Sequence, residues 1–179
     1  MKKILITRKL IKSSEELAEK IFNVNLNKED KLLTKDELIK KSEDCDAILS
    51  SLTEKFDSDV ISNLSAKVKI ISNFAVGFGN IDIEAAKKRN IIVTNTPDVL
   101  TDATAEIAIL ILLGAARRAK EGIEAAQTKN WKWTADFLMG KQLTGSRLGI
   151  LGMGRIGRAV ADRARSFGMK IHYFNRSRL

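Results

Sequence analysis

The stretch from Leu148 to Arg178 restricts the fold more than any other part of the chain, because it places a glycine turn between a strand pattern and a helix pattern. The apolar strand residues end in a GxGxxG hexapeptide, and apolar side chains then recur at helical spacing. A second apolar segment, residues 169–174, follows where dinucleotide-binding folds have their next strand. Such a hexapeptide alone is a weak signal, but this context predicts a dinucleotide-binding βαβ unit. The hexapeptide consists of Gly152, Met153, Gly154, Arg155, Ile156 and Gly157.

Each glycine of the hexapeptide has its own task in that prediction. We expect Gly152 to allow the turn, Gly154 to let a pyrophosphate approach the backbone, and Gly157 to let the helix pack closely on the strand. The phosphates would bind at the positive N-terminal end of the helix. The alternative is a glycine turn with a purely structural role.

The residues after the second strand indicate which dinucleotide is preferred. Folds that bind NAD usually carry Asp or Glu there, which accepts hydrogen bonds from a ribose hydroxyl. This chain has Asn175, Arg176, Ser177 and Arg178 instead, and so offers no carboxylate. Arginine and serine suit a 2′-phosphate, through a charge-assisted hydrogen bond and a hydroxyl. We therefore predict a preference for NADP(H), with NAD(H) as a possible cofactor; the alternative is a solvated basic loop.

The composition excludes several classes of protein. Apolar residues make up 44% of the 179 residues, enough for one sizeable core or two small ones. The single cysteine, Cys45, provides no disulfide framework and no thiol-rich metal site, and fits a cytoplasmic setting. The longest apolar stretch, residues 107–113, is far shorter than the roughly 20 residues of a membrane span. The net charge of +9 comes from cations spread among 22 acidic residues, so we expect a solvated surface and no nucleic-acid binding.

The first half of the chain alternates strand and helix patterns. Strands are expected at residues 3–7, 24–26, 47–51, 68–73 and 91–94, and helices at residues 13–22, 57–64 and 81–89 and after Thr34. Ser13, Thr34 and Asp57 are the candidate N-caps. This alternation predicts a parallel sheet with helices on both faces, in which ligands bind outside the carboxyl ends of the strands.

Two of these strand ends have unusual sequences. Residues 75–80, AVGFGN, lead from a strand into a helix, and their backbone amides could hold a small carboxylate. Residues 51–53 are expected on the same edge of the sheet, where they could add an apolar wall. The alternative is that Gly77 and Gly79 only turn the chain.

A long helix is predicted at residues 98–120, with Thr101 or Asp102 as its N-cap. It is apolar on almost every side, so we expect it to be buried by the neighbouring domain or by a second subunit. The segment that follows, residues 130–139, carries Trp131 and Trp133 without regular periodicity. We interpret it as an arm that packs against a partner, and we expect a homodimer.

Several motifs in one order resemble a known family. The sequences VGFGNID, TPDVLTDATAEIA, the tryptophan arm and LGILGMGRIG together are similar to the D-isomer-specific 2-hydroxyacid dehydrogenases, especially the glyoxylate/hydroxypyruvate reductase branch. The resemblance covers residues 3–179. It implies an α/β fold in which residues 1–97 form a flavodoxin-like substrate-binding domain. Residues 98–179 would begin an NAD(P)-binding Rossmann domain, of which we expect only the first part here.

The resemblance also implies a function for individual residues. It places Leu52 and Asn73 near the substrate pocket, and assigns the backbone amides of Val76 and Gly77 to the substrate carboxylate. Thr104 matches a cofactor-contacting position, and the backbone at Arg155 and Ile156 matches the pyrophosphate site. The expected substrate is a small 2-keto or 2-hydroxy acid of the glyoxylate or hydroxypyruvate type.

The chain departs from the family in its catalytic residues. The family's Arg, Glu and His all lie downstream of the second nucleotide-domain strand, so we expect no catalytic residue within these 179 residues. The only histidine, His172, falls inside that strand, where a packed or edge position is expected. We therefore expect the N-terminal portion of a reductase, inactive when isolated. The alternatives are a non-catalytic dinucleotide-binding or interaction protein of this ancestry and, on the basic charge alone, a nucleic-acid-binding module.

Overall fold

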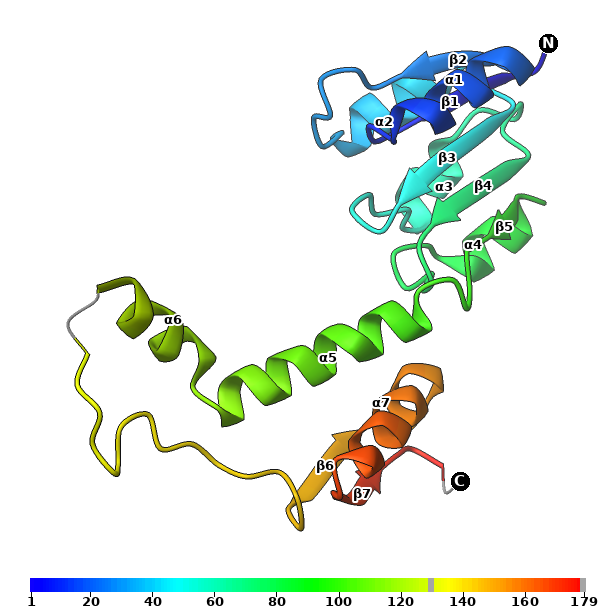
Figure 1. Ribbon diagram of the computed structural model, residues 1–179. Coiled ribbons are helices and arrows are strands. Elements are labelled where there is room, and N and C mark those ends of the chain that lie inside the picture. The colour runs from blue at the N-terminus through cyan, green and yellow to red at the C-terminus, as the bar shows by residue number, and fades with distance from the viewer. Residues whose placement is uncertain (129–130, 178–179) are drawn as a thin grey trace. The chain divides into compact units, whose positions relative to one another are not determined.

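A computed structural model describes residues 1–128 and 131–177 and divides the chain into two compact units, Met1–Val99 and Leu100–Leu179 (Figure 1). The first unit alternates strands and helices, as the sequence predicts. Its elements are β1 (Lys3–Ile6), α1 (Lys12–Ile21), β2 (Asn23–Leu26), α2 (Lys35–Ser42), β3 (Ala47–Ser51), α3 (Ser58–Asn63), β4 (Ile70–Phe74), α4 (Ile83–Lys88) and β5 (Ile92–Thr94).

The strands of the first unit form one parallel sheet of five strands in the order β2-β1-β3-β4-β5. This is the strand order of flavodoxin-like folds, which confirms the predicted fold class. Leu5, Ile48 and Ile71 are neighbours across β1, β3 and β4. Their side chains are buried on one face of the sheet and pack with apolar residues of α2, α3 and α4. Helix α1 lies over the opposite face, beside β1 and β2 (Figure 1).

The predicted helix caps are confirmed at two helices. Thr34 and Glu37 form a reciprocal capping box at α2, and the Asp57 side chain accepts a hydrogen bond from the backbone N–H of Val60 at α3. The prediction for Ser13 is wrong, because α1 begins one residue earlier and Ile11 occupies the cap position without a side-chain hydrogen bond.

Between residues 98 and 128, the second unit has two helices where one was predicted. Its elements are α5 (Thr101–Ala116), α6 (Ala119–Thr128), β6 (Arg147–Leu151), α7 (Arg155–Ser166) and β7 (Lys170–Phe174). The helical conformation is interrupted between α5 and α6 at Arg118, whose backbone takes the left-handed conformation with φ +53°. Neither Thr101 nor Asp102 caps α5, because the helix begins at Thr101 and Leu100 is its cap residue.

Helix α5 is apolar but is not buried on all sides. Ala105 and Ile109 are buried, and α5 packs along α7. Leu110 and Ile111 on another side are 62% and 64% exposed, so within the single chain this face is uncovered, and its burial by a second subunit stays a prediction. No helix in the described ranges is both long and apolar enough to cross a membrane.

Strands β6 and β7 form a parallel pair, joined by α7, as predicted. Leu151 at the end of β6 is level with Phe174 at the end of β7. The glycine turn and the loop after β7 therefore begin side by side. Residues 131–146 contain no helix or strand, in agreement with the predicted irregular arm, whereas Asn130 lies outside the described residues.

Candidate functional site

The loop at residues 75–80 leaves the carboxyl end of β4 with its carbonyl groups held by the protein. The Ala75 oxygen accepts a hydrogen bond from the Thr96 N–H at 2.9 Å, and the Val76 oxygen accepts one from Asn95 Nδ2 at 2.7 Å. The Gly77 oxygen accepts a hydrogen bond from Asn73 Nδ2 at 3.0 Å. Three successive peptide groups are thus fixed through their oxygen atoms.

This arrangement sets the direction of the backbone N–H groups. In a trans peptide the N–H points opposite to the carbonyl of the preceding residue, and the described chain has no cis peptide. The N–H groups of Val76, Gly77 and Phe78 therefore point away from the donors that hold the loop. Within the described residues, none of these N–H groups makes a hydrogen bond. N–H groups of a loop that have no hydrogen bond within the protein are available to an anion.

Two buried or half-buried asparagines support the loop from beneath. The Asn73 side chain is fully buried, and its Nδ2 also donates to Asn80 Oδ1 at 3.1 Å. Asn80 Nδ2 donates in turn to the carbonyl oxygens of Ser51 and Glu54. Asn80 therefore ties the loop after β4 to the loop after β3. Sequence reasoning named Asn73 but missed Asn80 and Asn95, although asparagines in loops commonly bond to backbone groups.

Leu52 lies in the loop after β3, on the same edge of the sheet as the loop after β4. Its side chain is 68% exposed, while the buried Glu54 accepts a hydrogen bond from the N–H of Ser51. Because Ser51 pairs with Phe74 in the sheet, both loops start at the same level. The structure thus brings Leu52, Asn73, Val76 and Gly77 to one edge of the first unit.

A charged clamp holds the outer side of the Leu52 loop. Arg8 Nε and Nη2 donate to the two carboxylate oxygens of Asp30, and Arg8 Nη1 donates to Thr53 Oγ1 at 2.9 Å. The hydrogen bonds from the Arg8 side chain and from the Lys9 N–H lower the pKa of the Asp30 carboxyl to about 2. The clamp therefore stays ionised at neutral pH.

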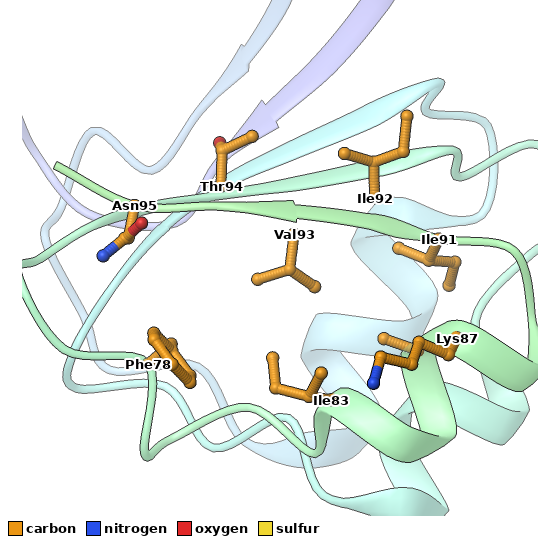
Figure 2. Close-up of a pocket in the computed structure, with 9 residues that line it drawn as sticks. Phe78, Ile83, Lys87, Ile91, Ile92, Val93, Thr94 and Asn95 are labelled. Carbon is orange, nitrogen blue, oxygen red and sulfur yellow. The ribbon is translucent and has the colours of Figure 1, made fainter.

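A shallow apolar pocket of about 390 Å³ lies between α4 and β5 (Figure 2). Phe78, Ile83 and Val93 line it, and Figure 2 shows Val93 and Asn95 on the same side of β5. Neither Val76 nor Gly77 contributes to its lining. The pocket is therefore a neighbour of the loop after β4 and not part of the predicted substrate site.

The glycine turn after β6 has the geometry predicted from its three glycines. Gly152 has φ +101°, a conformation that side chains rarely allow. A Cβ atom at Gly157 would overlap the carbonyl oxygen of Gly152, whereas a Cβ at Gly154 would enter open space. Gly154 caps α7 and offers no side chain to its first N–H groups. The turn therefore combines close packing behind it with an open approach to a helix N-terminus, where anions bind.

The other predicted cofactor residues lie in the turn, in the loop after β7 and on α5. Met153 is buried, while the side chains of Arg176 and Ser177 are exposed after β7. Asn175 Nδ2 donates to the Ser177 carbonyl at 3.1 Å, which shapes that loop. Thr104 is exposed on the first turn of α5. Arg178 lies outside the described residues.

Three further features bear on catalysis or metal binding: the histidine, the cysteine and the acidic side chains. His172 lies within β7, level with Gly149, as expected for an edge or packed histidine. Cys45 is buried, and burial raises the pKa of its thiol. No group of three or more His, Cys, Asp or Glu side chains that could hold a metal ion occurs in the part of the chain that the structure describes.

The fold and these features define an α/β protein that joins a flavodoxin-like unit to the opening βαβ segment of a dinucleotide-binding fold. The sequence profile of the D-isomer specific 2-hydroxyacid dehydrogenase catalytic domain matches residues 4–167. The chain belongs to this family, as the sequence motifs predict.

Individual relatives agree with this assignment. The chain is 42% identical to a glyoxylate reductase of Thermococcus kodakarensis over 98% of its length, and 43% identical to a glycerate dehydrogenase of Hyphomicrobium methylovorum over 99%. It superposes with a TM-score of 0.89 and 40% identity on an NAD-binding D-isomer specific 2-hydroxyacid dehydrogenase of a Polaromonas species, covering 100% of this chain and 56% of that one. The chain spans about half the length of the curated relatives, 54% and 55% of these two.

Proposed function

We propose that this chain provides the substrate-carboxylate site and the pyrophosphate turn of an NAD(P)-dependent 2-hydroxyacid dehydrogenase. Its substrates are 2-keto acids of the glyoxylate and hydroxypyruvate type. The observation that carries the proposal is the loop after β4, in which the N–H groups of Val76 and Gly77 point away from the hydrogen bonds that fix their peptides. Relatives named glyoxylate reductase and glycerate dehydrogenase support the substrate class.

In this proposal the loop binds the substrate through its carboxylate. Two N–H groups donate charge-assisted hydrogen bonds to the two oxygens, and such bonds are about twice as strong as neutral ones. The exposed side chain of Leu52 forms an apolar wall beside them. A small keto acid suits this site, because its carboxylate accepts hydrogen bonds from the N–H groups and its short carbon chain packs against Leu52.

The turn after β6 binds the cofactor pyrophosphate, with the N–H groups at the start of α7 as donors. Arg176 and Ser177 bind the 2′-phosphate of NADP(H), which a carboxylate at that position would repel, so NADPH is preferred over NADH. When bound, the cofactor supplies the hydride that reduces the keto carbon. Thr104 is assigned a cofactor contact by family resemblance alone.

The complete enzyme is a homodimer in this proposal. The exposed apolar side chains on α5 and the exposed Trp133, 78% accessible, support a surface that a second copy covers. We place the protein in the cytoplasm, where an unpaired buried Cys45 stays reduced.

The one histidine of the chain, His172, lies within β7, which is not where the family resemblance places the proton donor. We therefore propose that the 179-residue chain binds ligands without turnover. A non-catalytic dinucleotide-binding protein is the alternative, favoured by the same observation.

Fluorescence titration of the 179-residue chain with NADPH and NADH tests the cofactor half of the proposal, and NADPH oxidation with glyoxylate tests turnover. The expected result is tighter binding of NADPH without oxidation. Absence of binding to either dinucleotide would contradict the assignment of the turn. Oxidation of NADPH by the chain would contradict its proposed inactivity.

A further inference from the structure

We infer that Asn95 is a positioning residue of the carboxylate site, because its side chain fixes the direction of the Gly77 N–H. The inference rests on the proposed function of the loop after β4. Asn95 follows β5, nineteen residues after Val76, and neither a sequence motif nor the family resemblance assigns it a task.

The geometry follows from one hydrogen bond and one peptide plane. Asn95 Nδ2 donates to the Val76 carbonyl oxygen at 2.7 Å. The same peptide group contains the Gly77 N–H, which must point the opposite way. Asn95 therefore aims the Gly77 N–H without touching the substrate.

The other two fixed peptides of the loop differ in how they are held. The Ala75 carbonyl, which sets the Val76 N–H, is held by the backbone N–H of Thr96. The Gly77 carbonyl, which sets the Phe78 N–H, is held by the buried Asn73. Of the two N–H groups proposed to bind the carboxylate, only that of Gly77 is therefore set by a side chain.

Local structure favours this role over a packing role. Asn95 is half-buried at the end of β5, and Figure 2 shows its side chain on the side of the strand that faces Phe78. Among the described residues, Asn95 Nδ2 is the one donor to the Val76 oxygen, so this side chain holds the direction of the peptide.

The test uses the ¹⁵N-labelled 179-residue chain titrated with glyoxylate, with the amide signal of Gly77 as the readout. The variants are Asn95→Ala, which removes the donor, and Asn95→Asp, which keeps the shape but sets an acceptor against the Val76 oxygen. Asn63→Ala is the matched control, because Asn63 also donates to a backbone oxygen, that of Asp59 within α3.

We expect Asn95→Ala to weaken glyoxylate binding about ten-fold and Asn95→Asp to weaken it further, with the melting temperature near that of the wild type. Asn63→Ala should bind as the wild type does. Equal affinity of all variants would overturn the role of Asn95 while leaving the carboxylate site intact. A wild-type Gly77 signal that ignores glyoxylate would overturn the site and the inference together.

The wild-type chain provides a test that requires no variant to fold. Saturation with glyoxylate should shift the side-chain NH₂ signals of Asn95 together with the Gly77 amide, because one peptide group connects them. Asn95 signals that stay in place while the Gly77 amide shifts would overturn the inference.

Discussion

Gly157 stands so close behind Gly152 that a Cβ atom on it would overlap the Gly152 carbonyl oxygen. This contact brings the start of α7 against the end of β6 and leaves the front of the turn open. The two glycines thus have structural tasks, while the front of the turn at Gly154 is available to a ligand.

Alanine at two of these glycines should separate packing from binding. Gly157→Ala should destabilise the second unit by about 1–3 kcal/mol, because backbone atoms must move to admit the methyl group. Gly154→Ala should fold normally, since its Cβ meets open space, yet weaken NADPH binding about ten-fold or more. Thermal melting and NADPH titration of both variants check this. A Gly154→Ala chain that binds NADPH normally would contradict the proposed approach of the pyrophosphate.

The double variant Asn175→Asp/Arg176→Ala should shift the preference from NADPH toward NADH. The new carboxylate can accept hydrogen bonds from a ribose and repels a 2′-phosphate. The ratio of the two dissociation constants is the measurement. Lys170→Glu, at the opposite end of β7, is the control, because it changes the net charge by the same two units. An unchanged ratio would show that the loop after β7 does not read the 2′-phosphate.

Asn73→Ala should destabilise the first unit by about 1–3 kcal/mol, because it leaves buried partners of Asn73, such as Ser50 Oγ, without a hydrogen bond. Urea denaturation measures the loss. The exposed Asn63→Ala provides the comparison, with an expected change within about 0.5 kcal/mol. Equal stability of the Asn73→Ala and Asn63→Ala variants would mean that Asn73 does not support the loop.

The Arg8–Asp30 pair should make the stability of the first unit depend on pH. The pKa of the Asp30 carboxyl falls from 3.8 to about 2 in the fold, so the stabilisation is present above about pH 4 and is lost as the pH falls through about 2. Asp30→Asn should flatten this part of the stability curve, and asparagine tolerates the left-handed backbone at this position, φ +52°. Glu43→Gln is the charge-matched control. A curve that Asp30→Asn leaves unchanged would contradict the clamp.

Leu110→Glu should abolish the proposed dimer, because a charge on the exposed apolar side of α5 cannot be buried without cost. Light scattering over a range of concentrations measures the mass. Gln127→Glu adds the same charge to the surface of α6 and should leave the mass unchanged. A wild-type chain that stays monomeric at all concentrations would remove the support for the homodimer.

The fold was largely predictable because its signals are local. Alternating apolar segments predicted the parallel sheet, and the GxGxxG hexapeptide predicted β6, the turn and α7. The break at Arg118 was not predictable, because an arginine in the left-handed conformation leaves no mark in the sequence. The cap of α1 was misjudged because Ser13 and Glu16 have capping-box spacing, but the helix starts before them.

The candidate site was predictable only where a motif lies within one segment. Val76 and Gly77 belong to a glycine-containing loop, and the hexapeptide is continuous. Asn80 and Asn95 instead donate hydrogen bonds to backbone oxygens far away in the sequence. Asn80 donates to Ser51, and Asn95 donates to Val76. Such pairs depend on the strand order, which sequence patterns do not specify.

The most direct test of the central claim is an amide NMR titration of the wild-type chain, first with glyoxylate and then with NADPH. We predict that glyoxylate shifts the amide signals of Val76 and Gly77, and that NADPH shifts those of Gly154, Ile156 and Gly157. Two separate, saturable responses would support the proposed pair of sites. If glyoxylate left both loop amides unchanged, the chain would lack the carboxylate site on which the proposed function depends.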